Sequence, residues 1–127
     1  INFDVLKNKK KKFLFVYLIK HKNQIILKKG KNTKFLHGLM EIPNNLLNSK
    51  TSLKIAKKNA PLELDWKIVP GKLNSKISNF ELEIRFFKAQ VKQKFFLKNA
   101  IWVNKSEIQK IPISTLMKNI LSYLNPA

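Results

Sequence analysis

The sequence predicts an α/β (α+β) fold in which a mixed β-sheet is flanked by about two helices. Three patterns predict it. Residues 13–19 are apolar at every position, as in a central strand covered on both faces. Residues 80–86 alternate between apolar and polar side chains, as in a half-buried strand. In residues 113–124 the apolar positions lie three and four apart, as in an amphipathic helix.

The length and composition fit one globular domain with a strongly basic surface. Of the 127 residues, 44% are hydrophobic, and the 26 basic against 7 acidic residues give a net charge of +19. Such a charge attracts polyanions, with nucleic acid as the first candidate and an anionic membrane surface as the second. Arg85 is the only arginine, so base reading by arginine forks is not expected. A solvated lysine surface without a partner stays an equal alternative.

Several function classes are excluded by residue type. The chain has no cysteine, which excludes disulfides, a thiolate nucleophile and an iron–sulfur cluster within it. His21 and His37 cannot form a zinc site without carboxylates. The longest apolar run, residues 13–19, is too short to cross a bilayer, so we expect a cytoplasmic protein, and of the two candidate polyanions we expect nucleic acid and no membrane as the partner. Because the chain begins at Ile1, we expect it to be a piece of a longer protein.

The first half of the chain is expected to form a hairpin and a third strand. Residues 1–12 are lysine-rich and predict a basic linker or leading arm. Strands at 13–19 and 24–29 would pair around a short turn. A basic loop at 30–34 precedes a strand at 39–42, which the following proline ends.

A polar loop at 44–49 is expected before a short helix. Thr51 or Ser52 can cap this helix, and Pro61 stops it. The helix would direct three side chains inward, those of Leu53, Ile55 and Ala56.

The rest of the chain is expected to alternate strands and connections. In order these are a strand at 62–69, a loop at 70–79, the long strand from residue 80, strands at 95–97 and 101–103, a helical turn at 106–109 and the final helix, capped near Ser114. Most aromatic side chains are expected in the core, including Trp66, Trp102, Phe95 and Phe96.

Three motifs, in this order, carry a family resemblance. GLMEIP at 38–43 is similar to G-L-W-E-F-P, KISNFELEI at 76–84 to T-F-S-H-F-x-L-x-I, and WVNKSEIQKIPISTLMKNIL at 102–121 to W-V-x-x-x-E-L followed by P-x-P-T-x-M-x-K-x-L. Together they resemble the C-terminal domain of MutY-type adenine DNA glycosylases, and the resemblance covers nearly the whole chain. It implies a single Nudix-like domain over residues 13–127.

The resemblance also implies a recognition element. In that family the catalytic domain removes adenine mispaired with 8-oxoguanine, and a Phe-Ser-His loop of the C-terminal domain recognises the oxidised guanine. Position by position, this loop corresponds to Ile77, Ser78 and Asn79, of which only the serine is kept. Oxidation leaves a proton on N7, so a reader must supply an acceptor, which the Ser78 hydroxyl and the Asn79 carbonyl can do. Serine and asparagine are also ordinary turn-forming residues, and this alternative stays open.

Lysines near this loop are expected to contact the DNA backbone. Lys72 and Lys76 flank it, and the basic loop at 30–34 supplies Lys31 and Lys34. Such contacts add affinity without selectivity. The implied partners are double-stranded DNA with an 8-oxoguanine:adenine mispair and the N-terminal catalytic domain of the same parent protein. We expect a monomer in the bacterial cytoplasm, associated with the nucleoid when bound, and no cofactor in this chain, since the family's iron–sulfur cluster would belong to the N-terminal part.

The Nudix-like fold also implies an enzyme alternative. Nudix hydrolases hold Mg²⁺ with the clustered glutamates of an R-E-x-x-E-E helix, because this hard cation requires carboxylate oxygens. Between Glu41 and Glu63 the chain has no Asp or Glu, and the expected helix carries Lys54, Lys57 and Lys58. Hydrolase activity is therefore not expected. A general nucleic-acid-binding domain and a structural domain that packs on a catalytic partner remain alternatives.

Overall fold

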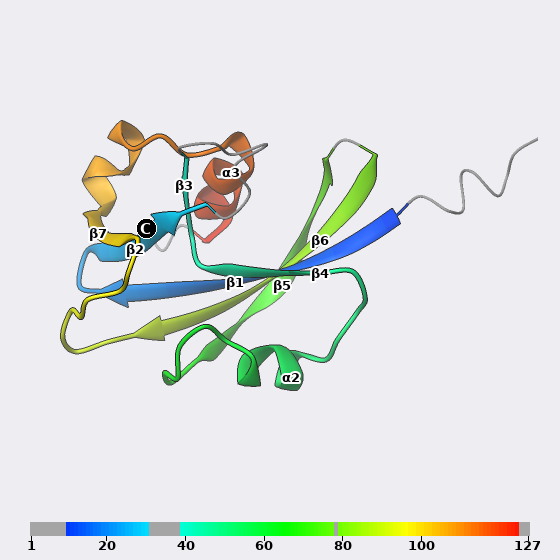
Figure 1. The fold of residues 1–127 in the computed structure, drawn as a ribbon, viewed down its shortest axis with the longest axis horizontal. Coiled ribbons are helices and arrows are strands. Elements are labelled where there is room, and N and C mark those ends of the chain that lie inside the picture. The colour runs from blue at the N-terminus through cyan, green and yellow to red at the C-terminus, as the bar shows by residue number, and fades with distance from the viewer. Residues whose placement is uncertain (1–9, 31–38, 78, 125–127) are drawn as a thin grey trace, which may run out of the picture. The chain divides into compact units, whose positions relative to one another are not determined.

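The structure is a computed structural model that describes residues 10–30, 39–77 and 79–124 (Figure 1). The described strands are β1 (Lys10–His21), β2 (Gln24–Lys29), β3 (Met40–Glu41), β4 (Asn44–Leu47), β5 (Lys67–Ile77), β6 (Phe80–Gln90) and β7 (Ala100–Asn104). The described helices are α2 (Leu53–Lys58), the 3₁₀ helix η1 (Lys105–Lys110) and α3 (Thr115–Leu124). Hydrogen bonding orders the sheet β3-β2-β1-β6-β5, with β4 paired to β1 and β7 to β2. The predicted sheet with few helices is confirmed.

The chain divides into two units. The first comprises Ile1–Tyr17 and Asn44–Phe87, and its described core is built around Tyr17. The Tyr17 ring stacks on Phe87 at 5.4 Å between centroids and meets Trp66 edge-on at 5.3 Å. Its hydroxyl donates a 2.7 Å hydrogen bond to the carbonyl oxygen of Ala56, which fixes α2 against β1. Phe15, Tyr17 and Trp66 are thus buried as predicted, whereas Phe13 is only half-buried.

Helix α2 forms where the cap residues predicted it. Ser52 is the N-cap, and its Oγ accepts a 3.1 Å hydrogen bond from the Ile55 amide. Ala56 is buried as expected, but the Ile55 side chain is 50% exposed, so its inward placement is wrong. A helix of only six residues buries a narrow stripe, and Ala56 occupies it.

The expected loop at 44–49 is wrong at its start, because β4 forms there. It pairs antiparallel with β1 over a register from Phe13↔Leu47 to Val16↔Asn44. The strand was not predicted because two of its four residues are asparagines, and asparagine is depleted in strands. Asn45 is instead held by a 3.1 Å hydrogen bond from its Nδ2 to the Asn59 carbonyl oxygen. Strand β1 itself begins at Lys10, so the last three residues of the expected arm are strand.

Of the expected strand at 62–69 only residues 67–69 are strand, and the expected loop at 70–79 is wrong because β5 continues through most of it. Strand β5 begins at Lys67 and continues to Ile77 through Pro70 and Gly71. Because β5 stands at the end of the strand order, the missing N–H of proline is tolerated. Gly71 has a φ of 91°, a conformation that side chains with a Cβ rarely adopt, so glycine permits the strand to continue.

The second unit comprises Leu18–Pro43 and Lys88–Ala127. Its β1–β2 hairpin is confirmed, with a two-residue turn between the paired residues His21 and Gln24. Strand β7, also predicted, pairs antiparallel with β2 from Gln24↔Asn104 to Lys28↔Ala100. The expected strand at 95–97 is wrong, and the Phe96 side chain is 89% exposed instead of in the core.

The C-terminal segment is as predicted. The helical turn is η1, and α3 follows it. Ser114 Oγ accepts a 3.1 Å hydrogen bond from the Met117 amide, which caps the helix, and Met117 and Ile120 are buried. Among the described residues no helix is long and apolar enough to cross a membrane.

Candidate nucleic-acid interface

The β5–β6 hairpin carries the residues expected to read the lesion. Strand β5 ends at Ile77 and β6 begins at Phe80 (Figure 1), so most of the expected loop at 70–79 is strand. Ile77 is half-buried and Asn79 is exposed, whereas Ser78 lies outside the described residues. The two described residues therefore stand at the tip of a hairpin whose second strand is anchored by buried Leu82 and Ile84. Their part in base reading stays a prediction.

The two lysines expected beside the loop lie on β5 itself. Lys72, Asn74 and Lys76 are exposed, and the residues between them are half-buried, so these three point to the same side of the strand. At about 3.3 Å per residue, the Cα atoms of Lys72 and Lys76 are about 13 Å apart, roughly four base-pair steps of a duplex. Lys31 and Lys34, the other two expected backbone contacts, lie outside the described residues.

Glu83, on β6, forms a charge cluster that the sequence did not predict. Its carboxylate is 6% exposed and meets three cations, with Lys11 Nζ and Lys72 Nζ at 3.4 and 3.5 Å from Oε1 and Arg85 Nε at 3.5 Å from Oε2. Burial by itself would raise the pKa of Glu83, but the hydrogen bond from Lys11 and the three positive charges outweigh it and lower the pKa. The carboxylate therefore stays ionised, and Lys72 is one of the cations that it pairs with.

Alternation along β6 placed Glu83 on a solvent-facing side with Glu81 and Arg85. That placement is wrong for Glu83, because side chains from neighbouring strands cover it. The sequence does carry a signal of such a cluster, namely a carboxylate between apolar neighbours in a chain with lysine-rich strands. Only the strand register shows which lysines the carboxylate contacts.

A further lysine lies near the hairpin tip. Lys12 Nζ stands 4.6 Å from the ring centroid of Phe80, the residue after Asn79. This distance is within the range of a cation–π interaction. The sequence placed Lys12 in the leading arm, so its position beside the tip was missed. Lys11 and Lys12 of β1 therefore add basic side chains beside the hairpin to those of Lys72 and Lys76 on β5.

The residues present do not fit the divalent cation of a Nudix hydrolase. Within the described ranges no three His, Cys, Asp or Glu side chains come together as a metal site. The helix that falls between Glu41 and Glu63 is α2, which exposes Lys54, Lys57 and Lys58. Glu83 has its carboxylate oxygens in contact with cationic side chains.

Comparison with known proteins identifies the fold. The family model described as NUDIX domain matches residues 14–123. Similar solved structures include the C-terminal domain of mouse MUTYH in complex with human PCNA (15% identity, 90% of this chain and 87% of that chain, TM-score 0.66) and the MutT protein of Methanosarcina mazei Go1 (15%, 94% and 98%, 0.65). The NUDIX domain of Shewanella oneidensis NrtR, complexed with ADP ribose, is also similar (12%, 98% and 97%, 0.62). At these identities the likeness shows the fold alone. No curated protein sequence matches the chain.

Proposed function

The chain belongs to the Nudix domain family, and within it we propose a DNA-repair recognition domain that contacts DNA and reads 8-oxoguanine opposite adenine for a separate adenine-glycosylase catalytic domain. The observation that carries this proposal is the basic β5–β6 hairpin, with Ile77 and Asn79 at its tip. The three motifs that resemble MutY-type glycosylases support it, as does the likeness to the mouse MUTYH domain.

The proposed chemistry at the hairpin tip is recognition of the proton that 8-oxoguanine carries on N7. Guanine presents an acceptor at N7, whereas 8-oxoguanine presents a donor there, so the protein must offer an acceptor. The exposed side-chain carbonyl of Asn79 and the hydroxyl of Ser78 are the proposed acceptors. A hydrogen bond that guanine leaves unpaired is worth about 1–3 kcal/mol, or about tenfold to a hundredfold in affinity. Ile77 replaces the family's aromatic ring and offers apolar contact without stacking.

The lysines of the hairpin supply affinity. Lys72 and Lys76 point to one side of β5, and Lys12 lies beside Phe80. Each lysine that meets a phosphate releases counterions and steepens the salt dependence by about 0.9 in the log–log slope. These phosphate contacts do not depend on the lesion. Raising the salt concentration therefore weakens the phosphate contacts, whereas replacing 8-oxoguanine by guanine removes only the base contact.

The likeness to Nudix hydrolases is a likeness of fold, and the residues argue against their chemistry. Three lysines on α2 repel a divalent cation that needs carboxylates. A partner protein is part of the proposal, namely the catalytic domain of the same parent chain. The complex of the mouse domain with PCNA supports protein binding by this fold.

The test is a titration onto two duplexes that differ only in 8-oxoguanine or guanine opposite adenine, at low and moderate salt. Ser78→Ala and Asn79→Ala remove the proposed acceptors, and Ser106→Ala, an exposed serine on η1, is the matched control. We expect a preference for the oxidised duplex that falls in the two tip variants and persists in the control.

Other outcomes point to the alternatives. Equal, salt-sensitive binding to both duplexes would indicate a general nucleic-acid-binding domain. No binding to either would indicate a structural role. Mg²⁺-dependent hydrolysis of an oxidised nucleoside triphosphate would contradict the argument from α2.

A further inference from the structure

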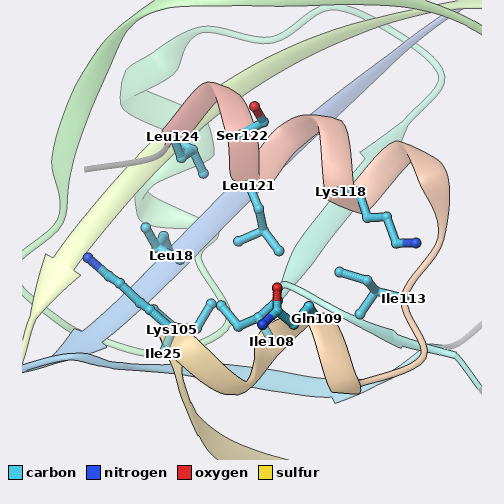
Figure 2. A pocket seen from close by; sticks show the side chains of 10 residues that line it. All are labelled: Leu18, Ile25, Lys105, Ile108, Gln109, Ile113, Lys118, Leu121, Ser122 and Leu124. Carbon is cyan, nitrogen blue, oxygen red and sulfur yellow. The ribbon is translucent and has the colours of Figure 1, made fainter. Parts of the chain in front are cut away.

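A pocket of about 460 Å³ lies within the second unit, between α3 on one side and η1 on the other (Figure 2). This volume lies in the range of small-molecule sites. Its walls are largely aliphatic, and Figure 2 shows Leu18 and Leu121 directed into it. Among the described residues its polar lining is Lys105, Gln109, Lys118 and Ser122, none of which is a carboxylate.

Lys105 lines this pocket, and a second lysine, Lys20, lies next to Lys105. The Lys105 amide donates a 2.9 Å hydrogen bond to the Asn23 carbonyl oxygen, which ties the start of η1 to the β1–β2 turn. Lys20 pairs with Ile25 across that hairpin, and paired residues of antiparallel strands point to the same face. Ile25 and Lys105 line the pocket, so Lys20, which is not itself a lining residue, lies on the same face of the hairpin as Ile25 and next to Lys105.

The charges of these lysines are not compensated. None of the ion pairs among the described residues involves Lys20, Lys105 or Lys118. The pKa of Lys20 is lowered, first by burial and then by the neighbouring Lys105. Two like charges held together by the backbone are unfavourable unless an anion lies between them.

We propose that this pocket binds an organic anion with an apolar body. The anionic group lies between the ammonium groups of Lys20 and Lys105, and the apolar body packs on Leu18, Ile25 and Leu121. Neither part of the ligand suffices: a bare anion leaves the aliphatic walls in water, and a neutral apolar molecule leaves the two lysines unpaired. The site uses none of the residues proposed to read DNA, so a test of this proposal is independent of the proposed function.

Octyl phosphate is the probe, titrated by calorimetry below its micellar concentration, with butyl phosphate, octanol and inorganic phosphate as comparators. We expect octyl phosphate to bind, with amide shifts in η1 and α3 in two-dimensional NMR. Each CH₂ group that is buried is expected to add about fourfold in affinity, so butyl phosphate binds about two orders of magnitude more weakly if all four extra groups are buried.

The double variant Lys20→Gln with Lys105→Gln removes the anion contacts and relieves a repulsion, so it is expected to fold. Its affinity for octyl phosphate should fall at least about tenfold. Lys110→Gln is the matched control, because Lys110 is on η1 but pairs with Glu107 at 3.0 Å. The proposal is overturned if octanol or inorganic phosphate binds as tightly as octyl phosphate, if the double variant binds like the control, or if octyl phosphate fails to bind.

Discussion

Glu83→Gln removes a negative charge that three cations share and keeps the shape of the side chain. Lys11, Lys72 and Arg85 would then surround a neutral amide. Breaking a fully buried ion pair costs about 3–5 kcal/mol. Here Lys11 and Lys72 are each 47% exposed, so water screens the repulsion that remains. We therefore expect the free energy of unfolding at pH 7 to fall by about 1–3 kcal/mol.

Urea denaturation measures this change, and Glu107→Gln is the matched control. Glu107 makes a shorter pair, 3.0 Å from Lys110, but its side chain is 48% exposed. The same loss of one charge should cost less than about 0.5 kcal/mol there. Equal costs for the two variants would refute the argument that burial gives the Glu83 cluster its strength.

The pH dependence of the unfolding free energy tests the same cluster, because the lowered pKa of Glu83 fixes the direction of the change. Because the cluster holds the pKa of Glu83 below its ordinary value, its stabilisation is fully present above the unfolded-state pKa, near 4.5, and is lost as the pH falls through the lower, folded-state pKa. The difference in unfolding free energy between the wild type and Glu83→Gln should therefore shrink in acid. A difference that stays constant from pH 7 to pH 3 would contradict it.

The other predictions are also read by urea denaturation. Ser52→Ala removes the N-cap of α2 and should cost about 1 kcal/mol, whereas a change near zero would mean that the cap contributes nothing. Tyr17→Phe leaves the buried Ala56 carbonyl oxygen without its 2.7 Å partner and should cost about 1–2 kcal/mol; no loss would show that water replaces the hydroxyl. Phe96→Ser should stay within about 0.5 kcal/mol of the wild type, and a larger loss would place that ring in contact with the core.

The elements that were predicted correctly are those with a local cause. Residues 14–19 of the apolar run are buried because each of their side chains is apolar, and α3 forms because its apolar stripe and its cap lie within one segment. Strand β4 and the second half of β5 have no such local pattern. They are strands because a neighbouring strand supplies hydrogen bonds to their backbone. Their asparagine, proline and glycine residues are depleted in strands, so the sequence does not predict this pairing.

The candidate site was predictable to the same extent. The motif predicted that these residues precede the strand from residue 80, and in the structure Ile77 ends β5 while Asn79 lies between β5 and β6. The charges around them were not predictable, since Lys11 and Lys72 reach Glu83 from strands far apart in the sequence. Alternation reports the face of a strand, but burial also depends on long side chains that cover that face.

Three of the acidic residues that the structure describes on this Nudix scaffold contact cationic side chains. Glu83, Asp65 and Glu107 each contact at least one lysine among the described residues, and the buried carboxylate of Glu83 holds its cations most firmly. A metal-dependent hydrolase needs the opposite arrangement, with carboxylates converging on an empty point. Lysines held at fixed positions by carboxylates suit a ligand whose charges are themselves spaced regularly, and a phosphate backbone has that property. Under the proposed function, Glu83→Gln should therefore free Lys72 and raise affinity for duplex DNA at low salt without any gain in preference for 8-oxoguanine.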